Sequence, residues 1–415
     1  MGASLIKNIA CLAGIGNPQL PLRGPDLQQL QIIPNAWLVV EDGHIAAFGS
    51  MDKLETDLQN SPAAVIDAAG QTVLPAWCDS HTHLVFAASR EEEFIDKIKG
   101  LSYAEIAARG GGILNSARKL NNCPEDELFR LSWSRLQEVI ALGTGALEIK
   151  SGYGLTIEGE LKMLRVIKRL REKSPIPIRS TFLGSHAYPE EFKSDHEGYI
   201  RLVIEEMLPR VAGEKLANYI DVFCEEGFFN PAETEKICRA GIALGLKPKI
   251  HANQLGASGG VQTGVKLSAI SVDHLEVMDE DAIRSLAASS TIGTLLPGAA
   301  FFLRMPFQPA RRLIDAGCAI ALASDYNPGS CPSGNMNLVL SLSCIQMRML
   351  PEEAINAATI NGAHAMEWGN ELGSIAVGKK ANLIFTEPIP SLSYLPYAFG
   401  SNLIKNVMIS GEFMK

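Results

Sequence analysis

Asp79-Ser80-His81-Thr82-His83 follows an apolar run, residues 71–78, that is typical of a short buried strand. Residues two apart in an extended chain point to the same side, so we expect His81 and His83 to present both imidazoles to one point in space. Neutral imidazole is the commonest side-chain ligand of a catalytic transition metal. Such a pair can also be structural and bond only to loop carbonyls. Residues elsewhere in the chain must decide between a metal site and structural histidines.

Beyond this strand the sequence alternates strands with helices. Apolar residues at helical spacing from Phe129 to Ile140 predict one helix, and a capping box that begins at Asn230 predicts another. With the strand before His81, the expected strands number eight, the other seven being 145–149, 178–183, 220–223, 248–250, 269–272, 291–296 and 319–323. This order predicts an α/β fold, a (β/α)8 TIM-like barrel. An open doubly wound sheet is the alternative, but no glycine-rich phosphate loop follows the first strand.

Both ends of the chain have sequence patterns typical of β structure. Asp42-Gly43 between two apolar runs predicts a hairpin, and short β-like segments recur at 373–378, 381–385 and 405–411. We therefore predict a small β-sandwich domain formed from both chain termini. Its two parts would be residues 1–70 and 369–415, and the barrel would comprise residues 71–368.

Histidines gather at the ends of the expected strands, where a (β/α)8 barrel has its active site. The eight histidines comprise five at strand ends (His81, His83, His186, His251 and His274) and three elsewhere that we expect to be structural or at the surface (His44, His196 and His364). Asp325 follows the eighth strand, which lies beside the first in a closed barrel. Asp325 can therefore reach a metal held by His81 and His83, with His251 as the third imidazole. Three imidazoles and a carboxylate leave a position for the water that a hydrolytic site needs.

The composition is that of an ordinary globular protein. It is 47% apolar and 20% charged over 415 residues, which excludes a disordered chain. A net charge of −9 without a basic run argues against nucleic acid as a partner. Eight scattered cysteines without a Cys-x-x-Cys pair suggest reduced thiols. No membrane-spanning run or secretory signal is found, so we expect a cytoplasmic protein with no membrane partner.

The residues at the strand ends resemble those of the amidohydrolase superfamily. The resemblance rests on His81-Thr82-His83, on the residues that end strands five, six and eight, and on the closing segment Gly378 to Leu383, where Asn382 replaces the commoner aspartate. Two-metal members carry a carbamylated lysine after strand four, where this chain has Glu225 and Glu226 instead. The resemblance thus implies one metal ion per subunit, zinc or iron, divalent or trivalent, with a bridging role for Glu225 or Glu226 as the open alternative.

Within the superfamily the chain most resembles the imidazolonepropionase family, along its whole length. The strings that carry the resemblance are 86–91, 110–113, 148–155, 182–187 and 324–330. This family opens 4-imidazolone-5-propanoate to N-formimino-L-glutamate in histidine degradation, and the resemblance implies a homodimer acting on this small molecule. The substrate-binding residues it implies are Arg90, Tyr153, His186, Asn327, Gly329 and Ser330, to which we add Tyr103 and Gln254 as pocket residues. A guanidinium such as that of Arg90 suits a carboxylate.

The resemblance also suggests a mechanism. The metal would activate a water for attack on the ring carbonyl, His274 would help to stabilise the oxyanion, and Asp325 would pass the proton to the leaving nitrogen. The alternative is a mononuclear deaminase of a nucleobase, or a related cyclic amidohydrolase. Such deaminases use a glutamate three residues after the strand-five histidine. Gln254 occupies that position here and cannot ionise, which disfavours the deaminase and leaves the general base open.

Overall fold

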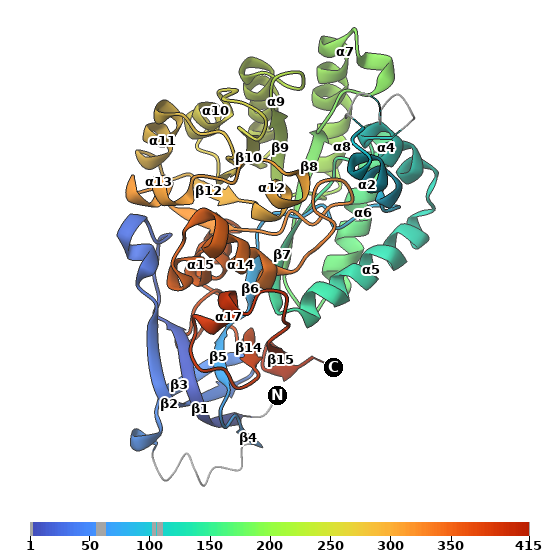
Figure 1. Cartoon of the computed structure of the whole chain (residues 1–415). Coiled ribbons are helices and arrows are strands. Elements are labelled where there is room, and N and C mark those ends of the chain that lie inside the picture. The colour runs from blue at the N-terminus through green and yellow to red at the C-terminus, as the bar shows by residue number, and fades with distance from the viewer. Residues whose placement is uncertain (1–2, 55–63, 102–104, 106–110, 415) are drawn as a thin grey trace.

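The centre of the molecule is a barrel of eight parallel strands. The structure is a computed structural model that describes residues 3–54, 64–101, 105 and 111–414. Each barrel strand pairs with the next one in the chain. The strands are β6 (Trp77–Asp79), β7 (Thr144–Lys150), β8 (Ile178–Ser185), β9 (Tyr219–Cys224), β10 (Lys247–Ala252), β11 (Ser271–His274), β12 (Ile292–Leu295) and β13 (Ile320–Leu322). The predicted (β/α)8 architecture is thereby confirmed (Figure 1).

The barrel closes where the last strand meets the first. The backbone N–H of Asp325 donates to the carbonyl of His81 at 3.0 Å, and that of His83 donates to the carbonyl of Tyr326 at 2.9 Å. Below these bonds, Asp79 accepts from the backbone N–H of Ser324 at 3.0 Å and from its hydroxyl at 2.6 Å. Closure therefore brings Asp325 beside the two histidines of the first strand, as the sequence predicts.

Helices surround the barrel, and their ends follow the capping signals. The helix expected from Phe129 to Ile140 is α5, and the one expected at Asn230 is α9, where the Asn230 side chain accepts from Ala232 and Glu233 and the Glu233 carboxylate accepts from the backbone of Asn230. Both predictions are confirmed. The helices are α2 (Glu91–Ile98), α4 (Ile113–Asn122), α5 (Glu125–Ala141), α6 (Ile157–Lys173), α7 (His196–Arg201), α8 (Leu208–Gly213), α9 (Pro231–Ala243), α10 (Gly260–Lys266), α11 (Glu280–Ala287), α12 (Pro297–Leu303), α13 (Ala310–Asp315), α14 (Met336–Met347), α15 (Pro351–Ala358), α16 (Ile360–His364) and α17 (Tyr394–Tyr397).

A second sheet combines the two ends of the chain, as predicted. It contains β1 (Ser4–Ile15), β2 (Gln31–Glu41), β3 (His44–Ser50), β4 (Ala64–Asp67), β5 (Thr72–Pro75), β14 (Leu383–Thr386), β15 (Ile404–Ile409) and β16 (Glu412–Phe413). The hairpin at Asp42-Gly43 is present, with positive φ at both residues, as its tight turn requires. The strands enclose an apolar core of their own, to which Ile6, Leu38 and Phe385 belong. The exact division at residues 70 and 369 stays a prediction.

Two details of the expected strands are wrong. The run 71–78 is two strands in two sheets: Ala76 donates its N–H to Asn382 of the terminal segment at 2.9 Å, and Trp77 donates to Gly143 of the barrel at 2.9 Å. The segment 373–378 forms only an isolated bridge, between Ile375 and Ile15. Gly373 and Gly378 bracket it with φ of 80° and 89°, conformations that end an extended run.

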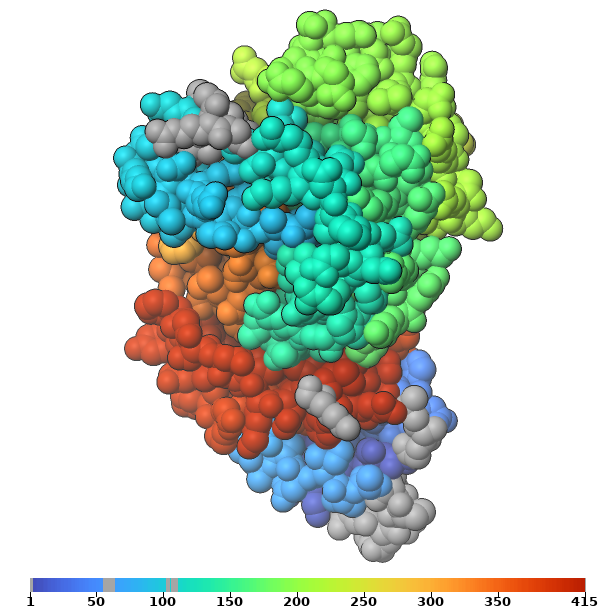
Figure 2. Space-filling model, turned by 90° about the vertical axis from the view of Figure 1, so that its right-hand side faces the viewer, coloured from blue at the N-terminus to red at the C-terminus, as the bar shows by residue number. Residues whose placement is uncertain are grey.

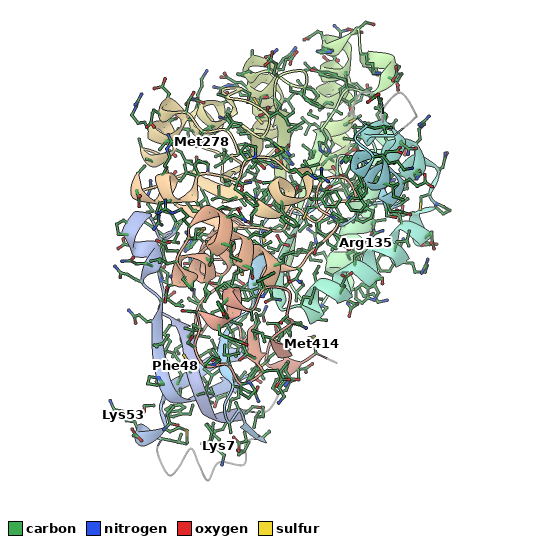
Figure 3. The ribbon with its side chains drawn as sticks, viewed as in Figure 1. Lys7, Phe48, Lys53, Arg135, Met278 and Met414 are labelled. Carbon is green, nitrogen blue, oxygen red and sulfur yellow. The ribbon has the colours of Figure 1, made fainter. Side chains whose placement is uncertain are left out.

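The barrel stacks on the terminal sheet along the long axis of the molecule. In Figure 1 the blue N-terminal strands lie at one end and the α2, α4 and α7 region at the other. Figure 2 shows the red C-terminal segment between them on one outer face. Arg135 of α5, labelled in Figure 3, donates to the carbonyls of Leu84 at 3.1 Å and Phe86 at 2.8 Å and so anchors the loop after β6. Among the described residues, no helix is both long and apolar enough to cross a bilayer.

Candidate functional site

Four buried side chains converge at the carboxyl end of the barrel. The Nε2 atoms of His81 and His83 lie 3.6 and 3.7 Å from Oδ1 of Asp325, and Nε2 of His83 lies 3.3 Å from Nε2 of His251. Nε2 of His81 has no hydrogen-bond partner among the described residues, although it is fully buried. A buried orphan nitrogen, beside imidazole nitrogens that face one another, fits a cation. The site could hold a metal through these four residues.

Carboxylates behind two of the imidazoles fix their orientation. Nδ1 of His81 lies 2.6 Å from Asp273, and Nδ1 of His251 lies 2.9 Å from Asp221. A carboxylate accepts, so Nδ1 of each ring carries the proton and Nε2 turns its lone pair toward the centre of the cluster. Burial, reinforced by the nearby Lys150 ammonium, holds the pKa of both rings well below the usual value. Both imidazoles are therefore neutral, the form that binds a metal.

A buried ionic network supports these carboxylates. Lys150, at the end of β7, lies 2.8 Å from Asp221, 3.5 Å from Asp273 and 2.7 Å from Glu148. Lys249 pairs with Glu148 on the other side and donates to the carbonyl of Ser80 at 2.9 Å. As the sequence indicates, Lys150 ends the second barrel strand and not the fourth, where a carbamylated lysine would lie. It links Asp221 and Asp273, the carboxylates that bond to His251 and His81. The sequence analysis did not predict this network. An ionisable residue inside an otherwise apolar strand is the sequence feature that could have indicated it.

The remaining candidate catalytic group is His274, at the end of β11. It lies within reach of the cluster, since ligand atoms of His81, His251 and His274 fall within 4.8 Å of one another. Burial lowers its pKa, but the carboxylates of Glu276, Asp325 and Asp273 outweigh that effect and raise it to about 8. His274 and Asp325 both have positive φ, 90° and 56°, an uncommon backbone conformation that clusters at functional sites.

The loop after Asp325 fixes that carboxylate. Ser330 Oγ donates to Oδ2 of Asp325 at 3.2 Å, and the Asn327 side chain donates to the Asp325 carbonyl at 2.7 Å and to Ser330 at 2.6 Å. The side-chain oxygen of Asn327, Oδ1, accepts from the N–H groups of Gly329 and Ser330, both at 2.8 Å. Burial raises the pKa of Asp325 to about 6. This loop therefore anchors the second oxygen of Asp325 through Ser330.

Glu225 serves the adjacent loop. Its buried carboxylate accepts from the N–H groups of Gln254 at 2.9 Å and of Leu255 and Gly256, both at 3.1 Å. Glu226 is exposed. Both oxygens of Glu225 bond to this loop, so Glu225 positions Gln254. Among the described residues, neither glutamate belongs to a group of side chains that could bind a metal together with the imidazoles.

A cavity of about 1060 Å³ opens above the cluster. Its lining includes the following residues predicted from the sequence: Arg90, Tyr153, His186, Gln254, Asn327, Gly329 and Ser330. The His186 ring stacks on that of His83, with centroids 5.2 Å apart, and Tyr153 lies 5.5 Å from His186. The structure thus brings these candidates together around the candidate metal centre. Tyr103 lies outside the described residues.

His186 is neutral in this cavity. Burial lowers its pKa to about 4. Its Nδ1 lies 3.1 Å from the carbonyl of Gly152, which can only accept, so Nδ1 carries the proton. Nε2 is then a hydrogen-bond acceptor.

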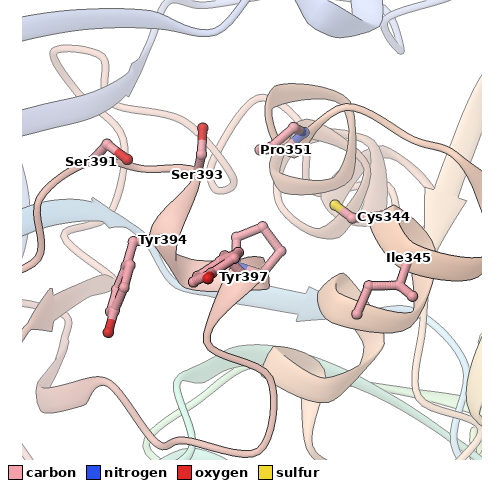
Figure 4. A pocket seen from close by; sticks show the side chains of 8 residues that line it. Cys344, Ile345, Pro351, Ser391, Ser393, Tyr394 and Tyr397 are labelled. Atoms are coloured by element: carbon pink, nitrogen blue, oxygen red, sulfur yellow. The ribbon is translucent and has the colours of Figure 1, made fainter.

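A second pocket, away from the imidazoles, lacks ionisable and metal-binding side chains of this kind among its described residues. Figure 4 shows this pocket, between α14 and α17, with a volume of about 410 Å³, which Cys344, Ile345 and Tyr397 help to line. Its described lining residues include no histidine, carboxylate or cation. The cavity above the imidazoles is therefore the better candidate for a reaction site.

Comparisons with known proteins place this geometry in context. A model of the amidohydrolase family matches residues 72–414. The chain is 56% identical over 412 residues to an imidazolonepropionase of Flavobacterium johnsoniae, covering 99% of this chain and 100% of that protein. It is 42% identical over 410 residues to an imidazolonepropionase of Geobacillus sp., covering 98% and 96%.

Solved structures share the fold at low sequence identity. A guanine deaminase of E. coli has a TM-score of 0.75 at 11% identity, covering 100% of this chain and 99% of that chain. A triazine hydrolase variant has a TM-score of 0.75 at 15% identity, covering 99% and 94%. At this identity the likeness concerns the fold alone.

Proposed function

The chain belongs to the amidohydrolase family, and we propose that it hydrolyses the ring amide of 4-imidazolone-5-propanoate to N-formimino-L-glutamate in histidine degradation. Relatives named imidazolonepropionase, 56% and 42% identical over nearly the whole chain, support this substrate. The observation that carries the proposal is the cavity, whose lining contains a guanidinium, Arg90, together with His186, which stacks on His83 of the imidazole–carboxylate cluster. A homodimer and a cytoplasmic location, as the family resemblance and composition suggest, complete the proposal.

The metal is part of the proposal. One ion, zinc or iron, would be held by His81, His83, His251 and Asp325, and their mixed nitrogen and oxygen donors suit either metal. When bound, the ion supplies Lewis acidity and lowers the pKa of a water so that hydroxide is available near neutral pH.

The substrate can be oriented by the lining residues. Arg90 offers the propanoate a charge-assisted partner. His186 is neutral, so its accepting Nε2 suits a ring N–H better than a carboxylate. Burial raises the pKa of Tyr153 above its usual value, so its hydroxyl stays protonated and can donate. Gln254 can hydrogen-bond the ring through its amide. Together these groups would hold the ring carbonyl over the imidazole cluster.

The chemical step needs a proton carrier and an oxyanion partner. Asp325 can take the proton of the attacking water and deliver it to the ring nitrogen as the amide bond breaks, since burial brings its pKa to about 6. The carboxylates around His274 raise its pKa to about 8, which favours the protonated ring that can donate to the oxyanion developing on the ring carbonyl. The cleavage leaves a new carboxylate and a formimino group in one ring-opened product, N-formimino-L-glutamate.

Product analysis tests the proposal. Metal-loaded protein is incubated separately with imidazolone-propanoate, guanine and cytosine, and product mass and ammonia are recorded. We expect the imidazolone to gain one water without releasing ammonia, and both bases to remain intact. Ammonia from a base, with the imidazolone untouched, would establish the deaminase alternative instead, although Gln254 cannot serve as its proton shuttle.

A further inference from the structure

The cavity above the imidazoles is electrically unlike the rest of the molecule. The chain has a net charge of −9. Among the described residues that line this cavity, however, the charged ones are Arg90, Lys97 and Arg304, and none is a carboxylate. A cleft lined by one sign of charge attracts ligands of the opposite sign. The cavity is therefore suited to an anion.

Arg90 is already tied to a carboxylate. Its Nε and Nη2 donate to one oxygen of Glu93 at 2.9 and 2.5 Å, and the other Glu93 oxygen accepts from the N–H of Gly112 at 3.0 Å. Glu93 is itself buried. The guanidinium lies against Gly329, where an added Cβ would collide with Nη1. Glu93 thus fixes the direction of Arg90 and compensates its charge.

Lys97 brings a second positive charge to the same face of α2. It lies one turn after Glu93, and its Nζ is 3.4 Å from the carbonyl of Gly329, the residue that Arg90 contacts. Nζ also lies 5.8 Å from the centre of the Phe302 ring, which stacks on Phe94 at 5.3 Å. Among Arg90, Glu93 and Lys97 one positive charge is in excess.

We infer that Lys97 is a second binding group for the carboxylate of the substrate, so that Arg90 and Lys97 together select ligands that carry a propanoate. The inference rests on the proposed function and names a residue that decides specificity there. The ammonium lies beside the Gly329 carbonyl and the Phe302 ring, and these contacts reduce the conformational entropy that it loses when a carboxylate arrives. Burial and the neighbouring Arg90 lower the pKa of Lys97. A bound carboxylate acts in the opposite direction and favours the charged form.

Two ligands of nearly the same shape, one with an anionic and one with a neutral side chain, isolate the contribution of Lys97. Imidazole-4-propanoate and the corresponding neutral propanamide are titrated by calorimetry into the metal-loaded wild type, Lys97→Met and Lys97→Arg. Lys99→Met is the matched control, because Lys99 is exposed at the end of the same helix and does not line the cavity. We expect Lys97→Met to weaken propanoate binding about tenfold and propanamide binding less than twofold, since a charge-assisted hydrogen bond is lost only with the anion.

The other variants complete the test. Lys97→Arg should retain most of the preference for the propanoate, and Lys99→Met all of it. Equal weakening of both ligands by Lys97→Met, or of neither, would overturn the inference. Turnover of the imidazolone is measured in parallel. A wild type that prefers the propanoate through Lys97 but does not open the ring would support the inference and contradict the proposed function. If the wild type opens the ring but Lys97→Met leaves the preference for the propanoate unchanged, the inference is contradicted and the proposed function is not.

Discussion

Asp325 uses its two oxygens for different purposes. Oδ1 faces the Nε2 atoms of His81 and His83, while Oδ2 accepts a hydrogen bond from Ser330. One oxygen can thus contribute to a cation site while the other stays oriented for proton transfer.

Replacing Asp325 with Asn should reduce kcat by about 10³-fold or more, because the amide cannot carry the proton. Metal content is measured beside steady-state kinetics, since the same side chain is a candidate ligand. Asp315→Asn, at an exposed carboxylate on α13, is the control and should behave as the wild type. Near-normal turnover in a metal-loaded Asp325→Asn variant would contradict the assigned role.

His186→Phe should raise KM by about tenfold with a smaller effect on kcat, because phenylalanine keeps the ring that stacks on His83 but lacks the accepting nitrogen. His196→Phe is the control, since this ring stacks on Tyr188 and does not line the cavity above the imidazoles. An unchanged KM for His186→Phe would show that its Nε2 makes no hydrogen bond to the substrate.

At the scale of elements, the barrel strands connect the candidate ligands to a buried lysine, Lys150. Strands β9 and β11 carry Asp221 and Asp273 inside the barrel, and β7 brings Lys150 between them. Each aspartate holds one candidate ligand, so a single ammonium supports two imidazoles on different strands. This is the arrangement through which the barrel can fix ligand geometry before a cation binds.

Lys150→Met should lower both stability and metal affinity. Removing one partner of a buried pair costs about 3–5 kcal/mol because the remaining charges are left uncompensated. Loss of the support behind the ligands is expected to weaken metal binding by about 10–100-fold. Urea unfolding and metal titration measure the two effects. Lys266→Met, which breaks an exposed pair with Glu235, is the control and should change stability by less than about 1 kcal/mol. Unaltered metal affinity in a folded Lys150→Met protein would contradict the positioning role.

The same elements show what sequence can reveal. The strands were predictable because each is a short apolar run, and a parallel barrel brings strand ends together, which placed His81, His251 and Asp325 near one another. The apolar pattern does not say that Asp221 and Asp273 point inward, or that Lys150 neutralises them. Lys97 was missed because nothing local distinguishes it from a surface lysine of α2. Its position depends on Phe302 and Gly329, more than 200 residues away in the chain.

At the scale of the whole molecule, the terminal sheet and the barrel share the segment that carries the first ligands. β5 belongs to the terminal sheet, β6 to the barrel, and the two are separated only by Ala76. His81 and His83 follow directly and complete the barrel by pairing with the segment after β13. Closure of the barrel therefore places His81 and His83 beside Asp325.

Removing the metal with a chelator should abolish turnover and lower the melting temperature, with both restored by added zinc or iron. A ligand that binds only the folded state stabilises it by about 4 kcal/mol when its concentration is a thousand times Kd. Thermal unfolding followed by circular dichroism measures this effect. Identical melting curves with and without metal, over a range of metal concentrations, would contradict a cation site in the closed barrel.

The measurement that tests the central claim most directly is hydrolysis of imidazolone-propanoate in ¹⁸O-labelled water, with the product fragmented in a mass spectrometer. Attack on the ring carbonyl breaks its bond to nitrogen and places one labelled oxygen in the new carboxylate next to the amino-bearing carbon. The formimino group stays unlabelled. We predict this pattern, together with its loss in Asp325→Asn. Label in the formimino carbon fragment, or a wild type that leaves the imidazolone intact, would contradict the account.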